Sequence, residues 1–404
     1  MTRVLTWLKA KTSANGQPTI GSALVELFDR FLYFGNTTTV SAPHVRDSIS
    51  TQQILNTFVI ASLPCWIFGM WNLGEQVNLA MEIIGQEGAV GLRGEIIALL
   101  GTGYDPYNDA ANFLHGFLYF LPAFLVALLT GAFLEALFAK HRQRPVDDGL
   151  LAIAWLYTLM LPATASLTLV AAGMAFGLVV GKLIFGGAGR YLVNPAVLGI
   201  AFLVFSYSGI LFGYGAWIPV LGYDEPLALE IAVEEGGVPA LLAVNYSWQL
   251  LFLGNQPGPI GVSSPLGCVI GAVYLLYRGV VSWRIMLGSA IGLIVTVFLF
   301  NIFGPADNPS FDVPWYWHMV LGGWAFGTVF LATDPVAAAT TNSGRWVFGL
   351  FVGAVTIVVH ITNPTYYDGT LFAILLASIF APLFDYVVVQ RNIKRRVARL
   401  AERA

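Results

Sequence analysis

Long apolar runs separated by short polar stretches dominate this sequence. A helix needs about 20 mostly apolar residues to cross the hydrocarbon core of a membrane, and it satisfies its own backbone hydrogen bonds. Only 11% of the residues are charged, far fewer than in a soluble domain. The sequence therefore predicts an all-α polytopic membrane protein. About ten transmembrane helices are expected, near residues 53–72, 111–139, 150–165, 167–185, 196–217, 260–276, 286–303, 315–331, 346–361 and 370–389.

The placement of lysine and arginine predicts the orientation, because these residues concentrate on the cytoplasmic side of membrane proteins. With ten spans and a cytoplasmic N-terminus, every basic residue except Arg93 falls on the inner side, and both termini are cytoplasmic. The chain then divides into a cytoplasmic N-terminal arm (1–52), a ten-helix transmembrane domain (53–389) and a basic cytoplasmic tail (390–404). The outer loops are acidic, which suits cations, although ordinary solvated loop charge explains this equally well.

Three stretches rich in Gly, Pro and Asn interrupt the helical pattern at membrane depth, at residues 186–195, 254–265 and 332–344. Irregular backbone survives there only where protein or a cavity covers it. Asn194 and Asp334 each precede a proline, the pattern of a helix N-cap followed by Pro at the first helical position. Such helix ends present free N–H groups that bind anions and polar ring edges. Simple capping explains each break alone, and together they favour a ligand pocket.

A short similarity links the two halves of the chain. A Gly-Arg-aromatic triplet lies beside the first break, at residues 189–191, and beside the third, at residues 344–346. The ten spans are therefore compatible with two related five-helix repeats, since paired broken helices build midplane sites in transporter-like folds.

Acidic residues are rare within or beside the spans, and we single out Glu135, Asp334 and Asp385. A charge at membrane depth is costly, so these three residues are candidates for an ion pathway. Pairing with an arginine of a neighbouring segment is an equally good explanation for Asp385. Gly131, one turn before Glu135, leaves room either for a flat ring or for a packed helix.

The sequence carries no motif for catalysis or metal binding. Cys65 and Cys268 both fall inside spans and lack the spacing of iron–sulfur or disulfide frameworks. We therefore predict no catalytic residue, no metal site and no nucleic-acid partner in this chain.

Six segments, in order along almost the whole chain, carry a resemblance to a known family: residues 44–48, 186–195, 320–323, 332–336, 341–344 and 381–396. Together they resemble the NqrB subunit of the bacterial sodium-translocating NADH:quinone oxidoreductase and, more weakly, the RnfD subunit of the related Rnf complex. The resemblance implies a ten-helix subunit in a six-subunit complex of the bacterial inner membrane. It also implies that the subunit relays electrons through flavin toward quinone, coupled to sodium export.

The resemblance implies site residues as well. A riboflavin is expected near Asn194, and the quinone side near Gly131 and Ala132, ahead of Glu135. The acidic residues at 135, 334 and 385 are the positions expected to handle sodium.

One departure from the family concerns its covalent flavin. The family attaches FMN through a phosphodiester to the Thr of an Asp-Gly-x-Ser-Gly-Ala-Thr motif on the outer side of the membrane. Here residues 221–227 read Leu-Gly-Tyr-Asp-Glu-Pro-Leu, so Leu227 stands where the Thr is expected. Leucine has no hydroxyl to esterify, and Asp224 and Glu225 would repel a phosphate. We predict no covalent FMN, and we expect riboflavin or another non-covalent flavin with quinone as the substrate.

Two other functions stay open at this point. The broken helices, the acidic outer loops and Leu227 are also compatible with a transporter-like or channel-like protein. A scaffold subunit that has lost the flavin relay is the second alternative.

Overall fold

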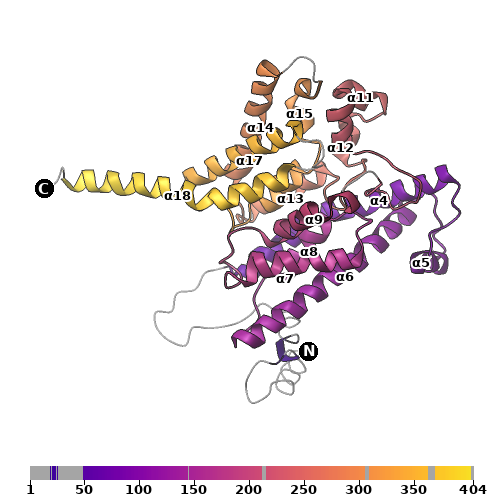
Figure 1. Ribbon diagram of the computed structural model, residues 1–404, viewed down its shortest axis with the longest axis horizontal. Helices are drawn as coiled ribbons and strands as arrows, with labels where there is room; N and C mark the ends of the chain where they lie inside the picture. The colour runs from indigo at the N-terminus through magenta and orange to yellow at the C-terminus, as the bar shows by residue number, and fades with distance from the viewer. Residues whose placement is uncertain are drawn as a thin grey trace.

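The computed structural model describes residues 49–143, 145–211, 215–304, 309–362 and 369–401, together with Thr19, residues 21–23 and residue 25. Within these ranges the chain forms helices and connecting segments and no β-strand (Figure 1). Most of the predicted N-terminal arm and the last three residues of the tail lie outside the described residues.

From residue 51, the first half of the chain folds into seven described α-helices and one π-helix, η1, which directly follows α8. They are α3 (Thr51–Ala61), α4 (Leu63–Ile84), α5 (Leu92–Leu100), α6 (Asp109–Arg142), α7 (Leu150–Leu159), α8 (Leu167–Leu178), η1 (Val179–Leu183) and α9 (Pro195–Leu211).

The second half begins with short helices and contains three long ones. They are α10 (Ala228–Glu230), η2 (Ile231–Gly236), α11 (Val238–Ala243), α12 (Trp248–Leu253), α13 (Pro265–Tyr277), α14 (Trp283–Phe303), η3 (Pro309–Asp312), α15 (Trp315–His318), α16 (Trp324–Phe326), η4 (Gly327–Leu331), α17 (Asn342–Thr362) and α18 (Gly369–Ala401).

Five of the described helical segments are long and apolar enough to cross a membrane, by length and composition. They are α3 with α4, α6, α14, α17 and α18, and shorter apolar helices occur at α7, at α8 with η1, at α9 and at α13. The prediction of an all-α polytopic membrane protein is confirmed.

Two predicted spans are shorter or more broken than expected. The span at 150–165 ends as a helix at Leu159, three residues before Pro162, because a proline disfavours helical backbone in the residue before it. The span at 315–331 is split into α15, α16 and η4. The split occurs at Gly322, whose φ of +65° is accessible mainly to glycine.

Glycine allows helices α14 and α17 to cross closely. Gly288 and Gly292 lie one turn apart on α14, and Gly349 and Gly353 lie one turn apart on α17. A Cβ atom at Gly353 would overlap the backbone carbonyl of Ser289. Small residues at this spacing let two membrane helices approach and gain packing contacts that replace the hydrophobic effect.

This crossing gives a first prediction. A Gly353→Ala substitution should destabilise the protein by about 1–3 kcal/mol, because the added methyl group meets fixed backbone. Thermal unfolding in detergent measures the effect. Gly209→Ala on α9 is the matched control, because open space surrounds that position. An equal loss of stability in both variants would contradict the role given to the crossing.

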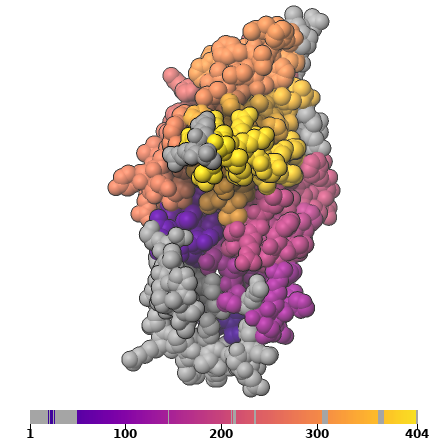
Figure 2. Space-filling model, turned by 90° about the vertical axis from the view of Figure 1, so that its left-hand side faces the viewer, coloured from indigo at the N-terminus to yellow at the C-terminus, as the bar shows by residue number. Residues whose placement is uncertain are grey.

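The C-terminal helix α18 extends well beyond the bundle (Figure 1). In Figure 2 its end projects toward the viewer, with the segment around α14 above it. The predicted basic tail therefore continues α18 as helix to Ala401, and the basic side chains between residues 391 and 399 are exposed.

Candidate functional site

The first and third helix breaks meet in the structure. Asn194 caps α9, because its Oδ1 accepts the N–H of Ala196 at 2.9 Å. The Nδ2 of the same side chain donates to Oδ2 of Asp334 at 2.8 Å. The Tyr191 hydroxyl lies 3.1 Å from each carboxylate oxygen of Asp334 and donates to that carboxylate. Residues 140 positions apart in the sequence therefore form one hydrogen-bonded junction, which we name the break junction.

Asp334 is the centre of the break junction. Its Oδ1 accepts the N–H of Val336 at 2.9 Å and that of Ala337 at 3.4 Å, and only 4% of the residue is exposed. Among the described residues no basic side chain lies within ion-pair distance of it. Neutral donors therefore hold this carboxylate, and its negative charge has no basic partner there.

Both breaks of the junction follow a π-helix of five residues, η1 before the first and η4 before the third. Single π-turns inside α-helices occur frequently at functional sites, because the extra residue shifts which side chains face inward. The two five-helix repeats remain a prediction, and this shared feature agrees with them.

The second break is anchored to α4. Asn72 donates through Nδ2 to the carbonyl of Gln256 at 2.8 Å, and Gln76 donates to Asn255 at 3.1 Å. Ser264 then caps α13 by accepting the N–H of Gly267 at 3.2 Å. These contacts give the second break a role in positioning α13.

Glu135 forms a buried ion pair that the sequence did not predict. Lys182 lies in η1 with 0% of its surface exposed, although its charge suggested an inner loop. Its Nζ donates to Oε1 of Glu135 at 2.5 Å and to the carbonyl of Asp148 at 2.7 Å. The other oxygen of Glu135, Oε2, has no hydrogen-bond partner among the described residues. A lysine inside a predicted span was the signal that could have identified this pair.

A cavity of about 290 Å³ lies beside this ion pair. Glu135, Arg142, Asp147 and Arg190 contribute its charged side chains, and we name it the Glu135 cavity. Asp147 ties it to the first break, because its Oδ2 accepts the N–H of Ala188 at 2.9 Å. The cavity therefore joins the inner end of α6 to the segment after η1.

Gly131 and Ala132 do not line the Glu135 cavity. A Cβ atom at Gly131 would meet the side chains of Leu150 and Met174, so this glycine packs against α7 and α8. Ala132 is half-buried against the main core. The assignment of both residues to the quinone side stays a prediction.

Asp385 holds the two threonines that directly precede α17. It accepts the N–H and the hydroxyl of Thr340 at 2.7 and 2.9 Å. It also accepts the N–H and the hydroxyl of Thr341 at 2.9 and 2.5 Å. In the described part of the chain no arginine pairs with it, and Arg345 instead donates to the carbonyl of Ala339. Asp385 is thus a half-exposed carboxylate held by neutral groups, as Asp334 is in the break junction.

The loop that contains Leu227 packs against the core and is held by hydrogen bonds to its own carboxylates. Leu227 is 6% exposed and belongs to the main hydrophobic core, and its N–H donates to Glu230 at 3.0 Å. Glu225 accepts hydroxyl hydrogen bonds from Tyr223 at 3.1 Å and Tyr246 at 2.5 Å. Burial and the Glu225 carboxylate raise the pKa of Tyr223 to about 12 and the pKa of Tyr246 above its ordinary value. Both hydroxyls therefore remain protonated donors at neutral pH.

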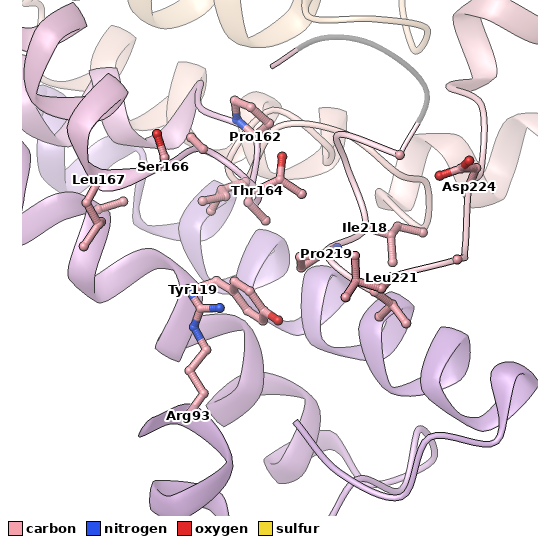
Figure 3. A pocket seen from close by; sticks show the side chains of 17 residues that line it. Arg93, Tyr119, Pro162, Thr164, Ser166, Leu167, Ile218, Pro219, Leu221 and Asp224 are labelled. Carbon is pink, nitrogen blue, oxygen red and sulfur yellow. The ribbon is translucent and has the colours of Figure 1, made fainter. Parts of the chain in front are cut away.

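The loop just before Leu227 lines a cavity of about 540 Å³, shown in Figure 3 and named the outer-loop cavity. Arg93 reaches over the Tyr119 ring on one side, with its guanidinium carbon 3.9 Å from the ring centroid. Asp224 lies on the opposite side. The other lining residues include the small polar Thr164 and Ser166 and several apolar side chains. The cavity thus combines a cation, an aromatic ring and an apolar wall.

Comparisons with known proteins add independent findings. A family profile described as "NQR2, RnfD, RnfE family" matches residues 38–394. The NqrB subunit of the Na(+)-translocating NADH-quinone reductase of Azotobacter vinelandii is 42% identical, over 93% of this chain and 94% of its own length. The protein of the same name from Chromohalobacter salexigens is 43% identical, over 93% of this chain and 91% of its own. That from Pseudomonas aeruginosa is 40% identical, over 93% of both chains.

Proposed function

The chain belongs to the NQR2, RnfD, RnfE family, and on that premise we propose that it is the NqrB-type membrane subunit of a sodium-translocating NADH-quinone reductase. The match to relatives of that name over almost the whole chain carries the proposal. The partners are then the other subunits of a six-subunit complex, quinone, sodium and the lipid bilayer. We place the protein in the bacterial inner membrane with both termini in the cytoplasm, in line with the distribution of its basic residues.

Covalent FMN does not fit the residues at position 227. The Leu227 side chain has no hydroxyl and is packed in the core, and Glu225 and Glu230 place carboxylates in the same loop. A phosphodiester there would need a nucleophile that is missing and would meet like charge. We therefore propose that this subunit carries no covalent flavin.

A non-covalent flavin fits the outer-loop cavity better. Pockets that hold small ligands and cofactors measure about 300–1,000 Å³, and this cavity falls within that range. Arg93 would attract an anionic group, and Tyr119 together with the apolar wall would cover a flat ring. A bound flavin would supply the electron-transfer chemistry of the subunit.

Asn194 would support a second flavin site, one that binds riboflavin, without contacting the flavin through its own amide. Both polar atoms of its amide are already engaged, one by Ala196 and one by Asp334. The side chain would therefore shape a riboflavin site by fixing the start of α9 in place.

The ion pathway is best supported at Asp385 and Asp334, whose carboxylates have no basic partner among the described residues. Glu135 has Lys182 as its cation, so its position beside a polar cavity favours a role on the quinone side. A direct role of Glu135 in sodium handling stays a prediction.

Flavin content is the experiment that tests this proposal. The purified complex should show flavin absorbance, and the band of this subunit on a denaturing gel should show no flavin fluorescence. The physical reason is that a flavin without a covalent link dissociates when the fold is lost. A fluorescent band for this subunit would contradict the interpretation of Leu227.

The same measurement addresses the alternatives. A purified complex without flavin absorbance would favour a transporter-like or scaffold subunit. The packing of Leu227 in the core and the Tyr246–Glu225 hydrogen bond in the same loop support that alternative. An Arg93→Met variant with the flavin content of the wild type would exclude the outer-loop cavity as the flavin site.

A further inference from the structure

The end of α18 has no role in the function proposed above. From Arg391 to Ala401 the helix extends beyond the bundle, and every residue of this stretch is exposed (Figure 1 and Figure 2). We propose that this stretch, which we name the docking helix, inserts into an apolar groove with an acidic rim on a water-soluble part of another subunit of the complex. The inference rests on the proposed function, because it assigns a surface to one of the partners named there.

The length of α18 carries the docking helix out of the membrane. A helix of 33 residues is about 50 Å long, whereas the hydrocarbon core of a bilayer is about 30 Å thick. Residues 383–401 include neither glycine nor proline, so nothing in this segment favours a bend toward the lipid surface. The docking helix therefore points into water, where it meets protein surfaces.

An apolar stripe runs along the docking helix. Ile393, Val397 and Leu400 follow each other at intervals of four and three residues, which places them on one face. Their exposed fractions are 47%, 59% and 67%, so the described chain leaves all three open to contact. An amphipathic helix that lies in a groove uses anchors at these intervals. The stripe thus indicates the shape of the partner surface, an elongated apolar groove.

Basic side chains surround the stripe. The docking helix has no acidic residue and five basic ones, namely Arg391, Lys394, Arg395, Arg396 and Arg399. Arg391, Arg395 and Arg399 are each two residues from a stripe residue, a rotation of about 200° that places them on the opposite face. Lys394 and Arg396 each adjoin a stripe residue and lie along its edges. None of the five pairs with an acidic side chain within the described ranges. An acidic rim on the partner therefore complements the helix, whereas a basic one would repel it.

Two simpler explanations account for part of this arrangement. Basic residues beside a span fix its orientation through their number, which requires no apolar row between them. Clusters of basic residues next to a span also bind anionic lipid headgroups. For that, the stripe would have to lie flat on the bilayer, whereas α18 continues in one direction to Ala401 (Figure 1). A protein groove explains the charges, the stripe and the direction of the helix together.

Photocrosslinking in the assembled complex identifies what covers the stripe. A photoreactive benzoylphenylalanine is placed at Val397 of the full chain and, as a control, at Asn392 on another face of the helix. We expect position 397 to crosslink to an apolar segment with acidic neighbours in a water-soluble part of another subunit, and position 392 to crosslink to it less. Crosslinks only to lipid, only to a second copy of this chain, or to no partner would overturn the proposal.

A stripe variant measures the apolar contribution. Ile393→Ala, Val397→Ala and Leu400→Ala together keep a strong helix former at each position and keep every charge. They should raise the dissociation constant of the crosslinked subunit at least about tenfold, because apolar area that was buried is lost. Asn392→Ala with Ala398→Gln is the control off the stripe and should bind as wild type. Thermal unfolding of the chain should be the same in both variants, since these positions are exposed.

A charge variant tests the acidic rim. Arg391→Gln, Arg395→Gln and Arg399→Gln together should weaken binding at low salt and reduce its dependence on salt, because attraction between exposed charges is screened. An equal loss at all salt concentrations would contradict the acidic rim.

The failure of this proposal can be told apart from the failure of the proposed function. An intact complex whose stripe variant binds as wild type, or whose control binds as weakly as the stripe variant, would overturn the docking helix and leave the proposed function in place. A chain that purifies from its native membrane without any other subunit would reject the proposed function, and the docking helix with it.

Discussion

Replacing Asp334 with alanine should destabilise the protein by roughly 2–5 kcal/mol, because each buried donor left without an acceptor costs about 1–3 kcal/mol. The substitution strands the Tyr191 hydroxyl and the Asn194 amide, and it removes the acceptor of two backbone N–H groups. Such a loss is a large part of the total stability of an ordinary domain. Thermal unfolding of the purified protein in detergent, together with its yield from membranes, measures the effect.

Asp105→Ala is the matched control for this prediction. Asp105 also precedes a proline, and it also accepts an N–H two residues ahead, from Tyr107 at 2.9 Å, but it lies in an exposed loop. Its replacement should cost about 1 kcal/mol or less, the value of one ordinary hydrogen bond. Equal losses in the two variants would mean that the local Asp-Pro turn matters and the contact between the breaks does not.

The sequence predicted the two breaks but not that they meet. A residue with a capping side chain followed by proline predicts a helix start from local chemistry alone, and this was right at Asn194, where α9 begins at Pro195. The same prediction at Asp334 was wrong: its side chain accepts the N–H groups of Val336 and Ala337, but only a turn follows Pro335 and the next helix begins at Asn342. Which partner the remaining polar atoms find depends on the packing of α9 against the segment after η4, and no local rule contains that information. Tyr191 was missed for the same reason, since nothing in its surroundings in the sequence points to a carboxylate 143 positions away.

The sequence was misleading at Lys182 because two rules conflicted there. The preference of basic residues for the cytoplasmic side suggests a loop position, whereas the residue falls inside the predicted span at 167–185. The π-helix at the end of α8 resolves the conflict by turning the lysine toward Glu135. Sequence periodicity assumes 3.6 residues per turn, so it does not predict where such a turn changes the register.

Replacing Asp385 with alanine should raise the half-activating sodium concentration of the complex about tenfold or more, which corresponds to at least about 1.4 kcal/mol of lost binding. The reason is that Asp385 is a half-exposed carboxylate whose charge has no basic partner within the described residues. Four hydrogen bonds from Thr340 and Thr341 hold it at the start of α17, so a cation would find it in a fixed position. Turnover measured against sodium concentration checks the prediction.

Because alanine also removes the acceptor that holds Thr340 and Thr341 ahead of α17, a second variant has to separate charge from structure. Asp385→Asn keeps the size of the side chain and one carbonyl oxygen for Thr340 or Thr341, so its melting temperature should stay closer to that of the wild type. If the charge matters, Asp385→Asn should lose sodium affinity nearly as strongly as Asp385→Ala. Asp312→Asn, at an exposed position in η3, should leave the sodium response unchanged. A normal sodium response in Asp385→Ala would remove this residue from the pathway and leave Asp334, held in the break junction without a basic partner in the described residues, as the remaining candidate.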